Sequence, residues 1–121
     1  MNIAIPAQSN SPDAKADSRF GRAAFFAVYD TDAKQWNFHD NAQNLQAAQG
    51  AGVQAAQNVA QTGAEVLLAG NVGPKAMAAL RAGGIRVFQL SENVTLTEAV
   101  KQYIDGKLQP LDQANVPGHW M

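Results

Sequence analysis

The feature that most constrains the fold is a βαβ pattern in residues 64–88. Residues 66–69 form a continuous apolar run with the length of a strand that is covered on both faces. Pro74 opens a helix where a missing N–H costs nothing, and the glycines at 83–84 end it. Residues 85–88 return to a β-rich pattern. The stretch therefore predicts two parallel strands joined by a short helix, and with them an α/β fold.

The other elements follow from local patterns along the chain. Residues 2–6 predict a short strand stopped by proline, and the aromatic-rich residues 23–30 and 35–40 predict a β-hairpin. The uncharged segment 41–64 predicts a helix with a small-residue face that ends at Gly63. Residues 95–106 predict a last helix that begins with a capping box.

The predicted order is strand, strand, strand, helix, strand, helix, strand, helix, in a single domain over residues 1–121 with a loose tail at 107–121. The first, third, fourth and fifth strands can point the same way, so the loops that follow them share one edge. Those loops are residues 8–22, 41–52, 70–75 and 89–93. A crevice is expected at this edge, between the first and fourth strands, where the direction of the connections reverses.

Composition excludes several classes of function. A net charge of −1 with 16% charged residues argues against a broad nucleic-acid or membrane surface, which would need a basic excess. The absence of cysteine excludes disulfides, zinc–thiolate sites and thiolate-ligated iron–sulfur clusters. No apolar run approaches the roughly 18 residues of a membrane span, so we expect a cytoplasmic protein.

The loop at residues 70–75 leads into a helix N-terminus, where free N–H groups and the helix dipole favour an anion. The candidate residues of this loop are Gly70, Asn71, Val72, Gly73, Lys75 and Ala76. A sulfide-bridged metal cluster is a bulky anion, and the N–H groups of Gly73, Lys75 and Ala76 suit its outer sulfurs. The alternative is a tight turn that binds nothing.

A second candidate segment lies at the end of the long polar loop, where Arg19 and Arg22 flank Phe20 and Gly21. Arginine supplies a fixed fork of donors for an anion. The alternative is two solvated arginines that pair with nearby acids, either Asp13 or Asp17.

The third candidate segment contains Gly50 and Gly52, which resemble the dinucleotide fingerprint in its G-x-G-x-x-A form. No strand immediately precedes them, so a closely packed helix start that lines the same crevice is favoured. His39 and His119 are weak metal-ligand candidates, because His39 shares a strand face with Gln35 and Asn37 and is expected to be exposed to solvent, and His119 lies in the expected tail. Nuclease chemistry would need clustered carboxylates on the central strands, and residues 2–6 carry none.

The positions of glycine and proline along the chain resemble those of a known protein family. At four short motifs the chain resembles the nitrogenase iron-molybdenum cofactor biosynthesis family. The motifs are Phe-Gly-Arg-Ala at 20–23, Gly-Ala-Gly at 50–52, Gly-Asn-Val-Gly-Pro at 70–74 and Ala-Gly-Gly-Ile-Arg-Val at 82–87. The resemblance covers nearly the whole chain. It implies a ribonuclease H-like motif with a mixed five-stranded sheet and helices on its faces.

The resemblance also implies a function. A stand-alone, cysteine-free member of this size is expected to be a non-enzymatic carrier or assembly scaffold for an anionic molybdenum–copper sulfide cluster, with the iron-molybdenum cofactor or a precursor as the alternative cargo. A protein donor or acceptor of the cluster is the expected partner. The competing hypothesis is a cofactor-free adaptor, with the uncharged Asn/Gln surface of residues 41–61 as its partner face.

Overall fold

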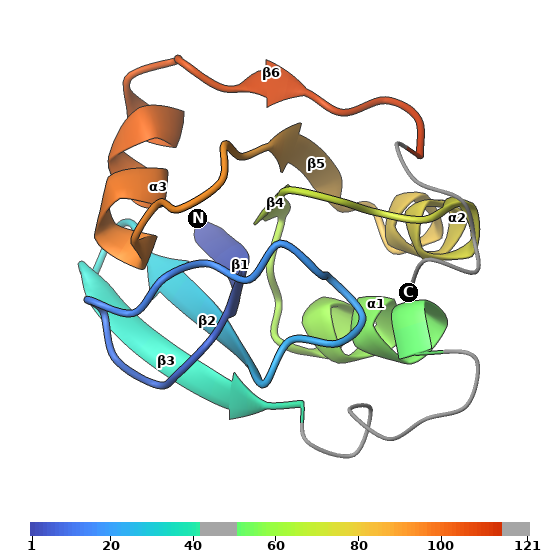
Figure 1. Ribbon diagram of the computed structural model, residues 1–121, viewed down its shortest axis with the longest axis horizontal. Coiled ribbons are helices and arrows are strands. Elements are labelled where there is room, and N and C mark those ends of the chain that lie inside the picture. Colours follow the sequence, from blue (N-terminus) through green and yellow to red (C-terminus); the bar gives the residue numbers. More distant parts are fainter. Residues whose placement is uncertain (42–50, 115–121) are drawn as a thin grey trace.

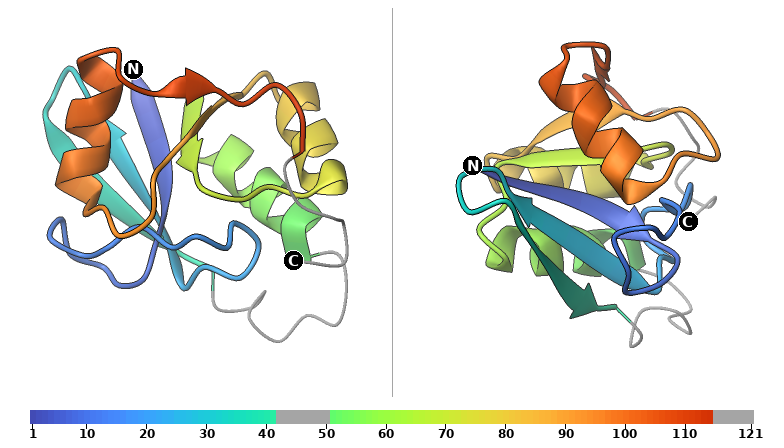
Figure 2. Two further views of the ribbon diagram at one scale, coloured as in Figure 1. Left: turned by 45° about the horizontal axis from the view of Figure 1, so that its top comes forward. Right: turned by 90° about the vertical axis from the view of Figure 1, so that its left-hand side faces the viewer.

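A computed structural model describes residues 1–41 and 51–114 and shows one mixed sheet with helices on both faces (Figures 1 and 2). The helices α1 and α2 cover one face, and α3 covers the other. The strands are β1 (Asn2–Ala7), β2 (Phe25–Asp30), β3 (Gln35–Asp40), β4 (Val66–Ala69), β5 (Arg86–Gln89) and β6 (Gln109–Pro110). The helices are α1 (Ala51–Gln61), α2 (Pro74–Ala82) and α3 (Leu96–Ile104).

Strand β1 lies in the centre of the sheet, whose order is β3-β2-β1-β4-β5-β6. It pairs antiparallel with β2 on one side and parallel with β4 on the other, and β4 pairs parallel with β5. The mixed α/β architecture and the predicted order of elements are therefore confirmed. The carboxyl ends of β1, β4 and β5 meet at one edge of the sheet (Figure 1).

The prediction of five strands is wrong, because the described sheet has six. Strand β6 pairs antiparallel with β5, with Phe88 opposite Pro110, and Leu111 N–H donates to Val87 O at 2.8 Å. A strand of two residues has no detectable period, and proline is tolerated because β6 lies at the edge. The described beginning of the expected tail is thus paired with the sheet, whereas residues 115–121 lie outside the described residues.

The alternation of side chains along the strands builds two cores. In β1, Ile3 and Ile5 face α3, whereas Ala4 faces α1 and α2 together with Leu67 of β4. All four side chains are fully buried. The buried face of α1 consists of small residues, Ala51, Ala55, Ala56 and Val59, which lets the helix lie close to the sheet. Both faces of β1 are therefore covered, as its apolar sequence requires.

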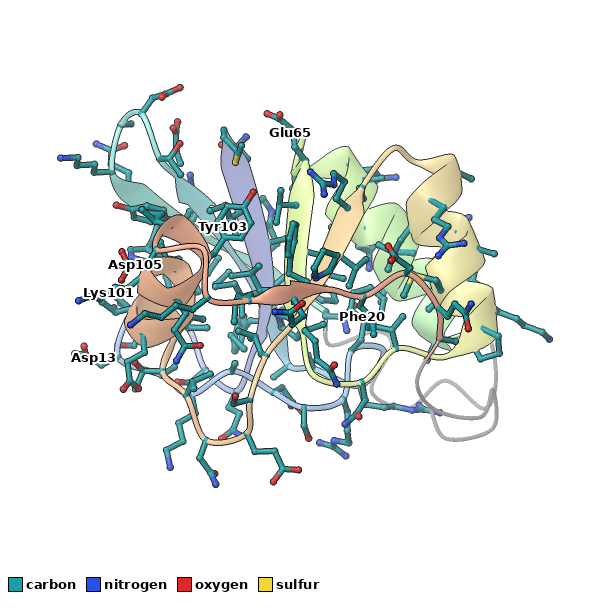
Figure 3. The ribbon with its side chains drawn as sticks, turned by 90° about the horizontal axis from the view of Figure 1, so that it is seen from above. Asp13, Phe20, Glu65, Lys101, Tyr103 and Asp105 are labelled. Carbon is teal, nitrogen blue, oxygen red and sulfur yellow. The ribbon has the colours of Figure 1, made fainter. Side chains whose placement is uncertain are left out.

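Helix α3 begins with the predicted capping box. Thr95 Oγ1 accepts the N–H of Glu98 at 3.2 Å, and the Glu98 carboxylate accepts the N–H of Thr95 at 2.9 Å. Tyr103 points from α3 toward the sheet and meets Phe88 edge-on at 5.0 Å, while Lys101 and Asp105 point away (Figure 3). Within residues 1–41 and 51–114, no helix has the length and apolarity needed to cross a membrane.

The capping box makes stability depend on pH. The backbone hydrogen bond from Thr95, followed by its side-chain hydrogen bond, lowers the pKa of Glu98 below the ordinary value of a glutamate. A lowered folded-state pKa contributes stability above the unfolded-state pKa, and that stability is lost as pH falls through the folded-state value. We expect Glu98→Gln, which keeps the cap but loses the charge, to be less stable than wild type at neutral pH in urea unfolding. The difference should shrink in acid, and a constant difference would contradict this account.

Candidate functional site

Two of the predicted segments lie side by side at the carboxyl edge of the sheet. Arg19 and Asn71 form an isolated parallel bridge, and Asn71 Nδ2 donates to Ser18 O at 3.1 Å. A Cβ built on Gly70 would lie 3.6 Å from the Cα of Ser18. The arginine-bearing loop therefore runs along the connection between β4 and α2.

The same loop touches the start of α1. A Cβ built on Gly21 would lie 3.0 Å from Gly52 N and 3.2 Å from Ala51 C, so a side chain at this position would press on the backbone of α1. The structure thus brings residues 19–22, 51–52 and 70–76 to one place, which we call the amide edge. Gly50 falls outside the described residues.

The N-terminus of α2 offers backbone donors to the amide edge. Its N-cap residue is Gly73, which supplies no side-chain cap, and Pro74 has no N–H. The N–H groups of Lys75 and Ala76 belong to the first turn, so they have no acceptor within the helix. The positive end of the helix dipole lies at the same position, and the Lys75 side chain is exposed there. This arrangement favours a negatively charged group.

Arg19 is paired with Asp17, one of the two acids named above as its alternative partners. Arg19 N–H donates to Asp17 Oδ1 at 2.9 Å, and Arg19 Nε lies 3.5 Å from the same oxygen. The Asp17 side chain is 10% exposed, whereas that of Arg19 is 56% exposed. The Arg19 backbone is therefore fixed by Asp17, and the guanidinium lies beside this carboxylate and remains open to solvent.

Two buried side chains anchor the loop that contains Arg19 and Arg22 to the protein core. Phe20 is fully buried and packs against Phe26, with ring centroids 5.4 Å apart. Asn41, also fully buried, donates through Nδ2 to Ala23 O at 2.8 Å and accepts from Asn58 Nδ2 at 3.2 Å. Asn41 was expected on an exposed partner face. It instead ties β3, the loop and α1 together, because a buried amide must find partners.

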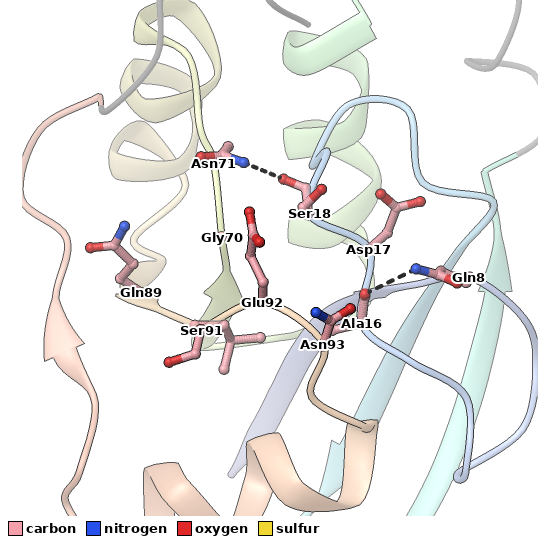
Figure 4. Close-up of a pocket in the computed structure, with 11 residues that line it drawn as sticks. Gln8, Ala16, Asp17, Ser18, Gly70, Asn71, Gln89, Ser91, Glu92 and Asn93 are labelled. Carbon is pink, nitrogen blue, oxygen red and sulfur yellow. Dashed lines mark hydrogen bonds between the residues drawn. The ribbon is translucent and has the colours of Figure 1, made fainter.

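A cleft of about 420 Å³ lies beside the amide edge and shares Gly70 and Asn71 with it (Figure 4). We call it the acidic cleft; it is lined by Gln8, residues 16–18, Gly70, Asn71 and residues 89–93. Three of the four loops predicted to share this edge contribute to it. Among the described lining residues, the charged side chains are Asp17 and Glu92, both acidic.

The walls of the acidic cleft are fixed by backbone hydrogen bonds. Asp17 N–H donates to Pro6 O at 2.8 Å, Ala16 N–H to Val94 O at 2.9 Å, and Leu90 N–H to Ala69 O at 3.0 Å. The long loop at 8–22, whose polar sequence is typical of a mobile segment, is thus tied to β1 and to the connection before α3.

The remaining candidates have less access to a ligand. The side chains of Val72 and Ala76 are buried, so only their backbone atoms are available. His39 is exposed on β3, opposite Phe26, and His119 lies outside the described residues. Within the described ranges, no group of three His, Asp or Glu side chains is arranged to hold a metal ion.

Sequence reasoning missed the roles of Asn41 and Glu92, and it named Asp17 only as one of two alternative partners of the arginines. The pattern Asp-Ser-Arg at 17–19 was a usable signal, because an aspartate often accepts the N–H two residues on. The burial of Asn41 has no local signal, since it depends on the distant α1. Glu92 belongs to a loop that was predicted at this edge but not assigned to the site.

We expect Gly21→Ala to destabilise the protein by about 1–3 kcal/mol, because the new methyl group meets the backbone of α1 rather than a movable side chain. Gly70→Ala is the matched control, since its nearest atoms lie at ordinary contact distance; its effect should stay within about 0.5 kcal/mol. Urea unfolding measures both. Equal effects of the two substitutions would contradict the close approach of the loop to α1.

Comparisons with known proteins agree with this architecture. The family model described as dinitrogenase iron-molybdenum cofactor matches residues 1–106. The apo form of the orange protein from Desulfovibrio gigas superposes with a TM-score of 0.92 at 42% identity, covering 95% of this chain and 96% of that one. A putative NifB protein from Thermotoga, solved by NMR, gives a TM-score of 0.83 at 31% identity, covering 97% and 98%.

Among curated proteins, an uncharacterized protein of Methanocaldococcus jannaschii is 25% identical over 114 residues, covering 93% of this chain and 92% of its own length. The family match spans most of the chain and every helix of the described fold. On this evidence, the chain belongs to the dinitrogenase iron-molybdenum cofactor family.

Proposed function

We propose that this protein is a non-enzymatic carrier or assembly scaffold that holds an anionic, molybdenum-containing metal-sulfide cluster at the amide edge. Membership of a family described by the dinitrogenase iron-molybdenum cofactor supports the binding or carriage of a metal-cluster cofactor. The orange protein was solved in an apo form, which indicates that this relative takes up a ligand. A molybdenum–copper sulfide cluster is the proposed cargo, with the iron-molybdenum cofactor or a precursor as the alternative.

The observation that carries the proposal is the N-terminus of α2, which no side chain caps. The N–H groups of Lys75 and Ala76 belong to the first turn and have no acceptor within the helix, and anions bind such termini through the amides and the dipole together. The backbone of Arg19 forms a parallel bridge with Asn71, in the connection that leads into this turn. The donors therefore come from two segments that the fold holds at a fixed separation.

The chemistry of the donor set suits a sulfide cluster. The chain contains no cysteine, so a cluster here lacks protein thiolate ligands. Hydrogen bonds from backbone amides and guanidinium groups to the outer sulfurs provide outer-sphere stabilisation, and they require no proton or electron transfer. The proposed role of Arg19, Arg22 and Lys75 is to balance the negative charge, while the amides of residues 73–76 orient the cargo.

The buried residues of the amide edge support these donors rather than touching the cargo. Phe20 fixes the loop from inside the core, and Val72 fixes the connection between β4 and α2. Gly21 and Gly52 allow the loop and α1 to approach closely. The ribonuclease H-like assignment of the fold and a protein donor or acceptor of the cluster are parts of the same proposal.

The adaptor hypothesis has less support from the described residues. Asn41 and Asn58, two members of the proposed partner face, hydrogen-bond to each other, and Asn41 is fully buried. The two hypotheses differ in one measurable respect. A carrier gains stability when the cluster binds its native state, by about 2.7 kcal/mol at a ligand concentration of 100 times Kd, whereas an adaptor does not respond.

The test adds tetrathiomolybdate and copper to the protein and follows its melting temperature and the retention of colour after gel filtration. We expect Lys75→Ala and Arg22→Ala to weaken retention about fivefold, because each removes a positive charge from the amide edge. Arg81→Ala is the matched control, since Arg81 lies in the last turn of the same helix.

If Lys75→Ala and Arg81→Ala reduce cluster retention equally, retention depends on the net charge of the protein rather than on the amide edge. That result would contradict the amide edge as the binding site. An unchanged melting temperature in the presence of a stable cluster would contradict the carrier proposal as a whole.

A further inference from the structure

The two outer edges of the sheet differ in how they are protected against pairing with another strand. Strand β6 closes one edge with two residues, and one of them, Pro110, has no N–H to offer. Strand β3 forms the other edge with six residues that pair one-to-one with β2, without a bulge or a proline (Figure 2). Within the described residues no strand pairs with its outer side. Strand β3 is therefore an open template for one more strand.

The register of the hairpin determines which backbone groups of β3 point outward. Asn41 N–H donates to Ala24 O, so this pair, which continues the register of β2 and β3, is a hydrogen-bonded one. Hydrogen-bonded and non-hydrogen-bonded pairs alternate along an antiparallel ladder. Residues 35, 37 and 39 therefore bond to β2, whereas the N–H and C=O groups of Trp36 and Phe38 point to the open side.

The same two residues belong to an aromatic row on the face of the sheet that α3 covers. The ring centroid of Trp36 lies 4.9 Å from that of Tyr29 and 6.2 Å from that of Phe38, and the Trp36 and Phe38 rings are inclined by only 19°. All three side chains pack against the core beneath α3 but stay partly exposed. A strand added at this edge would cover the exposed part of the row, which favours its binding.

The sequence of β3 is complementary to itself when two copies run antiparallel and cross at Asn37. In that register Trp36 of one copy lies opposite Phe38 of the other, so their outward N–H and C=O groups bond to each other and their aromatic side chains pair. Lys34, just before β3, lies opposite Asp40, so opposite charges meet at both ends of the pairing. A shift of two residues in either direction places an aromatic residue opposite a charged one.

We propose that the protein self-associates through β3 into a two-fold dimer in which the two sheets join as one continuous sheet. A second copy is favoured over a strand of another protein, because the one sequence supplies both members of the aromatic pair and of the charge pair. One strand from each copy makes a small interface, so we expect a weak association that depends on concentration.

The proposed dimer leaves the amide edge of each copy outside the interface. Strand β3 runs parallel to β1, since β2 is antiparallel to both. Antiparallel pairing of the two β3 strands therefore places the carboxyl edges of the two copies at opposite ends of the join. The dimer carries two separate amide edges, and the inference does not depend on what they bind.

Sedimentation equilibrium of the full chain over a range of concentrations tests the association, and charges at position 37 test the register. Asn37→Lys and Asn37→Asp each place like charges opposite each other, so each variant should dimerise about fivefold more weakly than the wild type. An equimolar mixture of the two variants should recover wild-type association, because opposite charges then meet. Asn37 is exposed, so both variants keep the fold.

Gln109→Lys is the matched control, because it places the same charge on an exposed residue of β6, at the opposite edge of the sheet. Its association should equal that of the wild type. A wild-type protein that stays monomeric at millimolar concentration would overturn the inference. Equal weakening in Gln109→Lys and Asn37→Lys would also overturn it, as would a mixture of the two Asn37 variants that associates no better than either alone.

Discussion

The arrangement of the whole molecule depends on the two different pairings of β1. On one side β1 pairs antiparallel with β2, and on the other it pairs parallel with β4. The parallel side forces a crossover, so α1 and α2 both begin at the carboxyl edge of the sheet. The antiparallel side sends the hairpin away from that edge. The loops after β1, β4 and β5 therefore meet beside two helix N-termini, and the amide edge and the acidic cleft both arise from this single constraint.

The carboxyl edge is divided electrostatically, and Asp17 lies at the division. Through Oδ1 it pairs with Arg19 of the amide edge, while the residue itself lines the acidic cleft. The hydrogen bond from Asn71 to Ser18 joins the two halves at the same point. Backbone donors and cations are thus gathered on one side and carboxylates on the other, within one rigid edge. This division favours an anionic ligand on the first side.

The sequence was informative where local patterns decide the structure. The apolar run at Val66–Ala69, Pro74 at the start of α2 and the Thr95–Glu98 cap each predicted the observed element, because strand burial, helix starts and capping depend on neighbouring residues. Strand β6 was missed because its two residues pair with β5 only through the tertiary fold. The site shows the same contrast. The loops after β1, β4 and β5 were placed correctly, but the burial of Phe20 and Asn41 and the approach of Gly21 to α1 depend on distant contacts.

The central claim is that an anionic cluster lies against the amide edge. It is tested most directly by mapping amide shifts of the isotope-labelled protein while tetrathiomolybdate and copper are added. The account predicts shifts concentrated at residues 19–22, 51–52 and 70–76, with a new visible absorption band from the bound cluster. Shifts concentrated at residues 89–93 instead, or an unchanged map while the cluster itself remains intact in solution, would contradict it.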